Sequence, residues 1–395
     1  MLIKWGLSLF IYLAFFVINL KIKFYNPVWY LWLLLIACVS IGIGLFIITK
    51  RRIKTENQLC RQTKPLSEFN LIVSTVFKNE GNTVVETLKH YLRYKSVPEI
   101  VFYDDNSDDG SFEVLKSVEA TQKAHCTVKR LNRSEKILHP KGMGFEDLIK
   151  NHCGDYILIL DADTIIEEEA VEKALNIMSE NDLKVLHFTR RNDLSDDLAN
   201  NIADTEELFS TVNKIVGIFP WYFNGSGFII SVDIAKKIVY DEYSPSDDSQ
   251  ISFFLRKNKI EVFDALSLFA HEKAPQTLRK LLKQHSSWTK GGIHHYLEKE
   301  RFTIFPVAFI SAYLISSILN PLQIYNLFFP LAFIFIFGVD FISNRVVAGR
   351  GILKSLKNSL FHTFGLFFKG IVLVPYHLVT FPFRRHTFWF SRTQY

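Results

Sequence analysis

Two aspartates, Asp161 and Asp163, directly follow a short apolar run at residues 156–160. An apolar run of this length, preceded by Gly154, predicts a buried strand whose carboxyl end reaches a polar site. Because side chains two positions apart in an extended chain point to the same side, both carboxylates can converge on one cation. Mg²⁺ prefers one or two carboxylates together with the phosphate oxygens of a substrate, so the pattern predicts a metal site for a nucleotide diphosphate.

The same stretch also has a plainer interpretation, a polar strand end that precedes a helix. Glu167, Glu168 and Glu169 would then lie in the first helical turn, where the helix dipole favours negative charge. A second predicted strand, residues 99–103, also ends in an acidic loop, residues 104–110. Ligands of open α/β sheets bind at the carboxyl ends of strands, although Asp, Asn and Ser in such a loop are typical of a helix N-cap as well.

Predicted strands alternate with amphipathic helices from about residue 70 to residue 271. Residues 71–75 predict the first strand and residues 83–94 the first helix, which is joined to it by a turn at residues 79–82. This alternation predicts an α/β layer with a mostly parallel sheet. No G-x-G-x-x-G follows the first strand, which argues against a nicotinamide-dinucleotide domain.

The composition indicates a chain that lies partly in lipid. Of 395 residues, 48% are hydrophobic and 14% aromatic, with 36 Phe, which is rich for a soluble protein. The net charge of +6 is mild and its basic residues flank apolar runs, so it favours membrane orientation and excludes a nucleic-acid partner. The four cysteines have neither the spacing of a zinc site nor that of a disulfide framework.

Apolar runs of about the length that crosses a bilayer stand at both ends of the chain. Residues 1–52 predict two transmembrane helices, at 2–20 and 27–49, and residues 53–69 a linker. A cleaved signal peptide is the alternative for the first run, but it lacks a small-residue cleavage site. The basic cluster of Lys50, Arg51, Arg52 and Lys54 places the following segment, a domain at residues 70–300, in the cytoplasm.

The C-terminal region, residues 301–395, predicts two to three transmembrane or interfacial helices. Apolar runs at 302–319 and 322–339 surround a break at Asn320 and Pro321. A third run, 360–383, contains Lys369, and a charge at mid-bilayer costs about 2.5 to 3.5 kcal/mol. That run therefore predicts a span along a polar path, a re-entrant segment or an interfacial segment.

The acidic motifs together resemble those of the family 2 glycosyltransferases. The matching residues are Asn79-Glu80, then Asp104-Asp105-Asn106-Ser107-Asp108-Asp109-Gly110, then Gly154-Asp155-Tyr156 leading to Asp161-Ala162-Asp163. The resemblance implies a GT-A nucleotide-diphospho-sugar transferase domain, similar to the membrane-embedded synthases of hyaluronan, chitin, cellulose and poly-N-acetylglucosamine. It also implies that Asp104 or Asp105 contacts the nucleotide, that Asn79, Glu80, Lys141 and Asp161 bind the donor, and that Asp161 and Asp163 hold Mg²⁺ or Mn²⁺.

Residues 221–228 combine adjacent aromatics with Gly225 and Gly227 and resemble the acceptor-side glycine loop of the family. Glycines permit close approach of the backbone to a ligand, and flat aromatic faces suit sugar rings. A plain hairpin with core aromatics is the alternative.

Asp247 and Asp248 precede a helical run, and inverting transfer needs a base for the attacking hydroxyl. Asp248 resembles the second position of the family's Glu-Asp pair and is the predicted base. Asp247 stands in place of the Glu and is the predicted residue on the acceptor side. An acidic N-cap without chemistry is the alternative.

Gln284 and Trp288 lie four residues apart on one predicted helical face and resemble the Q-(Q/R)-x-R-W segment, which implies acceptor binding. The family's arginine is Ser287 here, so diphosphate contact from this helix would fall to Lys290 or Arg279. Anchoring of Trp288 at a membrane interface is the alternative.

These patterns predict a multi-pass membrane protein, in the plasma membrane, with a cytoplasmic inverting glycosyltransferase domain. The enzyme would move a sugar from a nucleotide-sugar, in particular a UDP-sugar, to a growing polysaccharide, with membrane lipid as a further partner. Transfer of one sugar to a polyprenyl phosphate or a glycolipid is one alternative, and a non-catalytic membrane scaffold is a more distant one.

Overall fold

The computed structural model describes residues 27–59, 64–122, 125–132, 140–192, 197–216, 225–240, 247–299 and 328–376. The chain falls into two compact units. We call the unit of residues 55–194 and 222–273 the sheet unit, and the unit of residues 1–54, 195–221 and 274–395 the helical unit. The helices α7 (Leu198–Val216) and α10 (Leu278–Lys299) lie inside the predicted 70–300 domain but belong to the helical unit.

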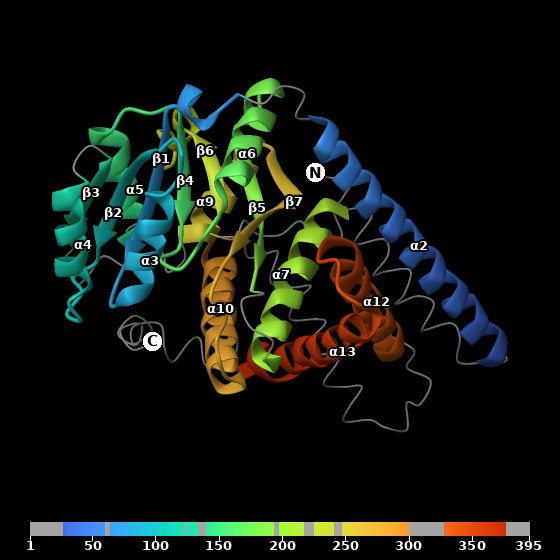
Figure 1. Cartoon of the computed structure of the whole chain (residues 1–395). Helices are drawn as coiled ribbons and strands as arrows, with labels where there is room; N and C mark the ends of the chain where they lie inside the picture. Colours follow the sequence, from blue (N-terminus) through green and yellow to red (C-terminus); the bar gives the residue numbers. More distant parts are fainter. Residues whose placement is uncertain are drawn as a thin grey trace. The chain divides into compact units, whose positions relative to one another are not determined.

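The sheet unit is built on a seven-stranded sheet with the order β3-β2-β1-β4-β6-β5-β7 (Figure 1). β6 is antiparallel to both of its neighbours, and every other pairing is parallel, so the predicted mostly parallel sheet is confirmed. The strands are β1 (Leu71–Phe77), β2 (Glu99–Asp104), β3 (Cys126–Arg130), β4 (Tyr156–Leu160), β5 (Val185–Arg191), β6 (Phe228–Ser231) and β7 (Val262–His271).

Helices of this unit connect the strands. They are η2 (Leu66–Glu68), α3 (Asn82–Tyr91), α4 (Ser111–Thr121), α5 (Pro140–Asn151), α6 (Glu168–Glu180), α8 (Val232–Ala235) and α9 (Asp247–Lys257). The first predicted helix, residues 83–94, is thus three residues shorter at its C-terminal end, and the first predicted strand, residues 71–75, is two residues longer.

Alternating side chains of each strand enter two separate cores, as the period of two in an extended chain requires. Leu158 and Leu160 of β4 pack with helices α3, α4 and α6, whereas Ile157 packs with α5 and α9 on the other face. Because both faces of the strands are buried, the carboxyl ends of the strands are the positions at which polar side chains can emerge.

The register of the parallel strands places three of these ends side by side. Thr75 of β1 pairs with Leu160 of β4, and Phe77 pairs with Asp104 of β2. The acidic loops after β2 and β4 therefore leave the sheet at one edge, on either side of β1.

Glu56, near the end of α2 (Pro27–Leu59), supports an irregularity of the sheet. The register of β5 and β7 shifts after His187, and Glu56 lies fully buried beside the shift. Its carboxylate accepts hydrogen bonds of 2.8 Å from the backbone N–H groups of Leu266 and Ser267 and from the Ser267 hydroxyl. The buried carboxylate thus accepts hydrogen bonds from backbone N–H groups of β7 at the point where the pairing of β5 with β7 is interrupted.

The helical unit has a polar interior. Its described helices are α7, α10, α12 (Phe328–Ile342), η3 (Ser343–Val347), α13 (Ile352–Phe368) and η4 (Lys369–Leu373), besides most of α2. α13 packs against α7 and α12 (Figure 1). Among the described residues of this unit, Asp204 pairs with Arg350 and Asp340 with His362, all four buried, and the partly buried Glu206 pairs with Lys369.

One helix among the described residues, Ile352–Tyr376, is long and apolar enough to cross a membrane. It begins eight residues before the predicted apolar run of 360–383, whose last residues lie outside the described part of the chain. The predicted spans at 2–20 and 302–319 also lie outside it, while 27–49 falls within α2 and part of 322–339 within α12. The remaining spans stay predictions.

Candidate active site

The carboxyl end of β4 is fixed by side chains from neighbouring segments. The carbonyl oxygen of Leu160 accepts a 2.9 Å hydrogen bond from Thr75 Oγ1 of β1. The next backbone N–H, that of Asp161, donates to Ser226 Oγ at 2.7 Å. The backbone at Asp161 is therefore held by β1 on one side and by the glycine loop before β6 on the other.

A chain of hydrogen bonds continues from Ser226 to the end of β7. Ser226 Oγ lies 2.7 Å from Thr164 Oγ1, which in turn lies 2.9 Å from Glu272 Oε1. Since Thr164 donates to the carboxylate, the Ser226 hydroxyl donates to Thr164. Arg190, near the end of β5, closes the chain by donating Nε–H to Glu272 Oε2 at 2.9 Å. Glu272 is only 3% exposed, so this network is a chain of largely buried polar groups that ends at the Asp161 backbone.

The two aspartates differ in electrostatic environment. Burial raises the pKa of Asp161, but the cations of Lys141 and Arg190 outweigh it and hold that pKa below its ordinary value. Burial and the carboxylates of Glu272 and Asp161 raise the pKa of Asp163 above its ordinary value. Asp163 Oδ2 accepts a long 3.3 Å hydrogen bond from the backbone N–H of Lys273. Negative charge is therefore in excess around Asp163.

Glu80, in the turn after β1, joins this group of carboxylates. Desolvation and the charges of Asp161 and Asp109 raise the pKa of Glu80, whereas Lys273 lowers it. The structure thus brings Glu80, Asp161 and Asp163 into one electrostatic cluster, and donor or metal binding by these residues stays a prediction.

A hard divalent cation fits this donor set. Aspartate oxygens are the ligands that Mg²⁺ and Mn²⁺ prefer, and a dication would offset the excess negative charge around Asp163. Within the described ranges, no three His, Cys, Asp or Glu side chains are placed to enclose a metal ion. Two aspartates would therefore supply the protein ligands, with the rest from substrate phosphate, which is the usual arrangement for Mg²⁺.

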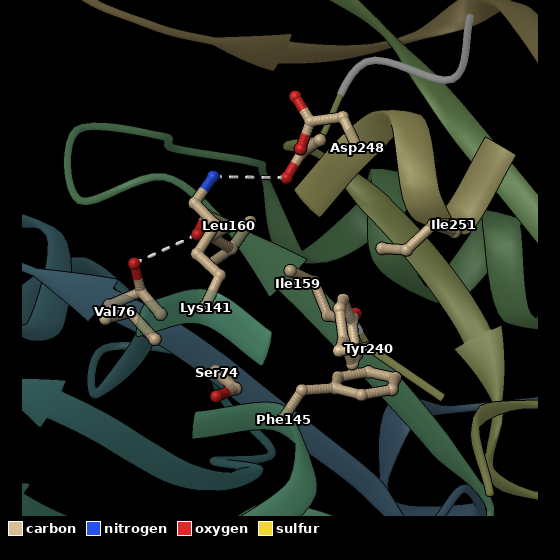
Figure 2. Close-up of a pocket in the computed structure, with 11 residues that line it drawn as sticks. Ser74, Val76, Lys141, Phe145, Ile159, Leu160, Tyr240, Asp248 and Ile251 are labelled. Atoms are coloured by element: carbon tan, nitrogen blue, oxygen red, sulfur yellow. Dashed lines mark hydrogen bonds between the residues drawn. The ribbon is translucent and has the colours of Figure 1, made fainter. Parts of the chain in front are cut away.

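Asp248 lies in the first turn of α9 and lines a pocket that also contains Lys141 (Figure 2). The pocket lies between the ends of β1 and β4 and helices α5 and α9, and Phe145 and Tyr240 form its apolar side with an edge-to-face contact of 5.7 Å. A carboxylate and an ammonium thus face one small cavity whose remaining walls are largely apolar.

Gly225 leaves room for the side chain of Asp248. A Cβ atom built on Gly225 would lie 1.5 Å from Asp248 Oδ1 and 2.1 Å from Asp248 Cγ. Only a residue without a side chain leaves room for the carboxylate there. The glycine loop predicted at residues 221–228 therefore seats the predicted base, although residues 221–224 lie outside the described part of the chain.

Lys141, in the first turn of α5, connects the two acidic groups. Its Nζ forms an ion pair with Asp161 and lies 3.4 Å from the carbonyl oxygen of Gly225. In Figure 2 the Nζ end of the Lys141 side chain points to the side of the pocket on which Asp248 lies. The predicted donor-binding lysine thus lies between the predicted metal ligand and the loop that seats the predicted base.

The loop after β2 is held by its own side chains together with residues of the neighbouring β3 and of the turn after β1. Asp104 is fully buried, pairs with Arg130 Nε at 2.7 Å and accepts the Ser107 N–H at 3.0 Å. Asn79, with a φ of 54°, accepts the Asp108 N–H through its side-chain oxygen at 2.9 Å. Asp105 is also buried, at 5% exposed. Asp104 and Asn79 therefore have structural partners, and nucleotide contact by Asn79, Asp104 and Asp105 stays a prediction.

Two family models match the chain. The model described as glycosyl transferase family 2 covers residues 72–239, and the model described as glycosyl transferase family group 2 covers residues 156–382, more than half of the chain. The chain belongs to the family 2 glycosyltransferases. The mostly parallel sheet is in keeping with the GT-A fold that the motifs imply for this family.

Curated relatives of this family 2 chain include the glycosyltransferase GlyG of Streptococcus pneumoniae, 30% identical over 45% of this chain and 60% of its own length. The poly-β-1,6-N-acetyl-D-glucosamine synthase of Staphylococcus aureus is 23% identical over 62% of this chain and 60% of its own. The chain thus spans about three fifths of the length of these relatives. A mannosyltransferase structure from Pyrobaculum calidifontis, in complex with GDP-mannose and Mn²⁺, aligns over 89% of this chain and 97% of its own, with 12% identity and a TM-score of 0.47.

The predicted acceptor-side residues lie on α9 and α10. Asp247 begins α9, directly before Asp248. Gln284 is half-buried on α10, and Trp288 is 42% exposed and stacks on His285 with ring centroids 5.7 Å apart. α10 belongs to the helical unit, and acceptor binding by these residues stays a prediction.

Sequence patterns missed Arg190, Glu272, Thr164 and Ser226 of this family 2 site. Arg190 lies near the end of β5, and Glu272 directly follows β7. Their position at the carboxyl ends of strands could have marked them as candidate site residues. The roles of Thr164 and Ser226 depend on hydrogen bonds between segments that lie 62 residues apart, which no local pattern predicts.

Proposed function

We propose that the sheet unit transfers a sugar, with inversion, from a nucleotide-diphospho-sugar to the hydroxyl group of a carbohydrate acceptor. The observation that supports this most strongly is the combination, in a family 2 chain, of the Asp161–Asp163 cluster with a pocket that holds both Lys141 and Asp248. The Asp161–Asp163 cluster suits the diphosphate and its cation, and the Asp248 carboxylate suits the hydroxyl group of the acceptor.

In this proposal Asp248 takes the proton of the acceptor hydroxyl, whose oxygen then attacks the anomeric carbon. The bond between that carbon and the diphosphate oxygen breaks, and the nucleotide diphosphate leaves with the bonding electrons. Gly225 and the first turn of α9 hold the base in place, which matters because orientation can supply several kcal/mol of the barrier.

The donor side relies on Lys141, Asp161 and Asp163. Lys141 would donate to the diphosphate, and the two aspartates would hold Mg²⁺ or Mn²⁺. When bound, the cation supplies charge neutralisation of the leaving diphosphate. The Ser226–Thr164–Glu272 network keeps the carboxylates oriented.

The distribution of side chains on α13 supports a membrane location. One face buries polar residues, among them Asn358 and His362, while the other exposes large apolar ones, with Leu353 82% and Phe364 56% exposed. A helix in water shows the reverse pattern, so lipid is the environment in which the exposed face is favourable. Pairing of Lys369 with Glu206 at 2.8 Å removes the cost of a lone charge, which favours a span over an interfacial segment.

We propose further that the product is a growing polysaccharide and that the sheet unit lies in the cytoplasm, at the plasma membrane. The basic residues Lys50, Arg51, Arg52 and Lys54 support this orientation. In this proposal the donor is a UDP-sugar. Transfer of a single sugar to a polyprenyl phosphate or glycolipid is the second candidate, and Ser287 in place of the family's arginine favours it.

One experiment tests the activity and separates the two candidates. Membranes that contain the protein are given a panel of nucleotide sugars with Mn²⁺, nucleotide release is measured, and the labelled product is sized. Polysaccharide synthesis predicts long chains, and the second candidate predicts a glycolipid of fixed size. Absence of nucleotide release with every donor, from folded protein, would favour the non-catalytic scaffold.

A further inference from the structure

We propose that Thr87 of α3 is a positioning residue for the metal site, which sets the affinity for the cation by fixing the backbone at Asp163. This inference rests on the proposed function, because it concerns the cation that Asp161 and Asp163 would hold. Thr87 contacts neither the cation nor the donor in this proposal. It acts through the peptide group that joins Ala162 to Asp163.

The carbonyl groups of the residues before and after Asp163 both accept hydrogen bonds from α3. Thr87 Oγ1 donates to the carbonyl oxygen of Ala162 at 2.7 Å. Tyr91 Oη donates to the carbonyl oxygen of Thr164 at 3.2 Å. Thr87 and Tyr91 lie four residues apart, hence on one face of the helix, and are only 1% and 0% exposed. The backbone that carries Asp163 is therefore attached to one helix on both sides.

The end of the same segment is held by a second set of contacts. His90 Nε2 donates to the carbonyl oxygen of Ile166 at 2.9 Å, and the hydroxyl of Tyr94, in the turn after α3, donates to the same oxygen. Ile165 exchanges two backbone hydrogen bonds of 2.8 Å with His271 at the end of β7. The far end of the segment is thus fixed by α3 and β7 together, and Thr87 holds the part that lies between the two aspartates.

The Thr87 hydroxyl has one proton and two acceptors within reach. One is the carbonyl oxygen of Ala162 at 2.7 Å, and the other is that of Thr83, in its own helix, at 3.2 Å. The longer contact is the ordinary bond of a helical threonine to the preceding turn, whereas the shorter one ties α3 to the site. Without the hydroxyl, the Ala162 carbonyl loses a buried hydrogen bond, and a shift that recovers one from water would be favourable. Such a shift moves both Asp161 and Asp163, because Ala162 joins them.

Thr211 of α7 provides a matched control. It is also 1% exposed, and its hydroxyl donates to the carbonyl oxygen of Glu207, four residues earlier in the same helix, at 3.1 Å. Thr87 and Thr211 thus share their burial and their bond to the preceding turn, but Thr87 also bonds to the segment that carries the aspartates. Thr211→Val therefore removes a buried hydroxyl without changing a contact of that segment.

The experiment titrates the purified full chain with Mn²⁺ in the presence of UDP and follows unbound Mn²⁺ by electron paramagnetic resonance. We expect Thr87→Val, which has nearly the same shape, to weaken Mn²⁺ binding by about tenfold, the lower end of the range for groups that orient metal ligands. Thr87→Ser, which restores the hydroxyl, and Thr211→Val should both bind Mn²⁺ as tightly as the wild type. Thermal unfolding confirms that each variant is folded, and Tyr91→Phe replaces Thr87→Val, with the same expectation, if the latter is not.

A purely structural role for Thr87 would lower the thermal stability and leave the Mn²⁺ affinity of the folded protein unchanged. That result would overturn the inference, as would a failure of Thr87→Ser to restore the affinity or an equal loss in Thr211→Val. In each of these cases the wild type still binds Mn²⁺ with UDP, so the proposed function stands. If the folded wild type binds no Mn²⁺ with UDP, the proposed function fails, and the inference with it.

Discussion

In the helical unit, buried carboxylates lie against partners of opposite charge. Asp204, fully buried on α7, pairs with Arg350, and Glu206 lies 2.8 Å from Lys369 and 2.6 Å from His285. Although burial raises the pKa of Glu206, the charges of Lys369 and His285 hold it well below its ordinary value. Such pairs balance their own charge and need no ligand.

In the sheet unit, the carboxylates at the ends of β4 and β7 are placed beside one another. Asp161 forms an ion pair with Lys141 and Glu272 with Arg190, whereas Asp163 accepts a long backbone hydrogen bond and its pKa is raised by both carboxylates. The same residue types thus form a balanced interior in one unit and an unbalanced cluster in the other. The difference is what we expect if the helical pairs stabilise the protein and the cluster holds a cation, as proposed above.

The largest effect is expected for the base, Asp248→Asn. An amide cannot accept the proton of the acceptor hydroxyl, so turnover should fall by about 10²- to 10⁴-fold while UDP binding with Mn²⁺ is retained. Nucleotide release and calorimetry measure the two quantities. Turnover within about threefold of the wild type would remove Asp248 from the mechanism.

Gly225→Ala should reduce turnover by about 100-fold, because the new Cβ must displace the carboxylate that it meets at 1.5 Å. Gly365→Ala in α13 is the control, since nothing lies within 4 Å of a Cβ there. Nucleotide release by the two folded variants is compared. Equal activity of both would show that the placement of Asp248 is not critical.

Arg350→Met should lower the free energy of unfolding by about 3 to 5 kcal/mol, because it leaves Asp204 buried without that partner. The double variant Asp204→Asn with Arg350→Met should recover part of this loss, which thermal unfolding in detergent can measure. If the double variant loses more free energy of unfolding than the two single variants lose together, Asp204 and Arg350 do not form a simple balanced pair.

Glu56→Gln should have a smaller effect on stability, about 1 to 3 kcal/mol, because an amide can satisfy fewer of the three donors around it. Lys173→Met is the control, because Lys173 donates an exposed hydrogen bond to Asn57, the residue after Glu56. Its loss should cost less than about 0.5 kcal/mol. Denaturant unfolding compares the two. Equal losses would mean that Glu56 is not needed at the shifted ladder of β7.

Much of the sheet unit could be predicted because its signals are local. The apolar run before Asp161, the acidic loop after β2 and the alternation of strands with helices all follow from residue spacing, and the carboxyl-end rule then predicts one site. The insertion of antiparallel β6 between β4 and β5 could not be predicted, since it depends on pairing between distant segments.

The helical unit was harder to predict for a physical reason. α7 reads as part of the continuous 70–300 domain, and only its buried contacts with α12 and α13 show where its polar face lies. Lys369 appears in the sequence as a costly charge within an apolar run, and its partner Glu206 is 163 residues away. Long-range pairing of this kind leaves no trace in local hydropathy.

The central claim is that the unbalanced cluster of the sheet unit binds a nucleotide diphosphate through a divalent cation. Calorimetric titration of the purified protein with UDP, in Mn²⁺ and in EDTA, tests it most directly, with Asp163→Asn as the comparison. The account predicts binding in Mn²⁺ that EDTA abolishes and that Asp163→Asn weakens by at least about tenfold. Equal UDP affinity in Mn²⁺, in EDTA and in the variant would contradict it.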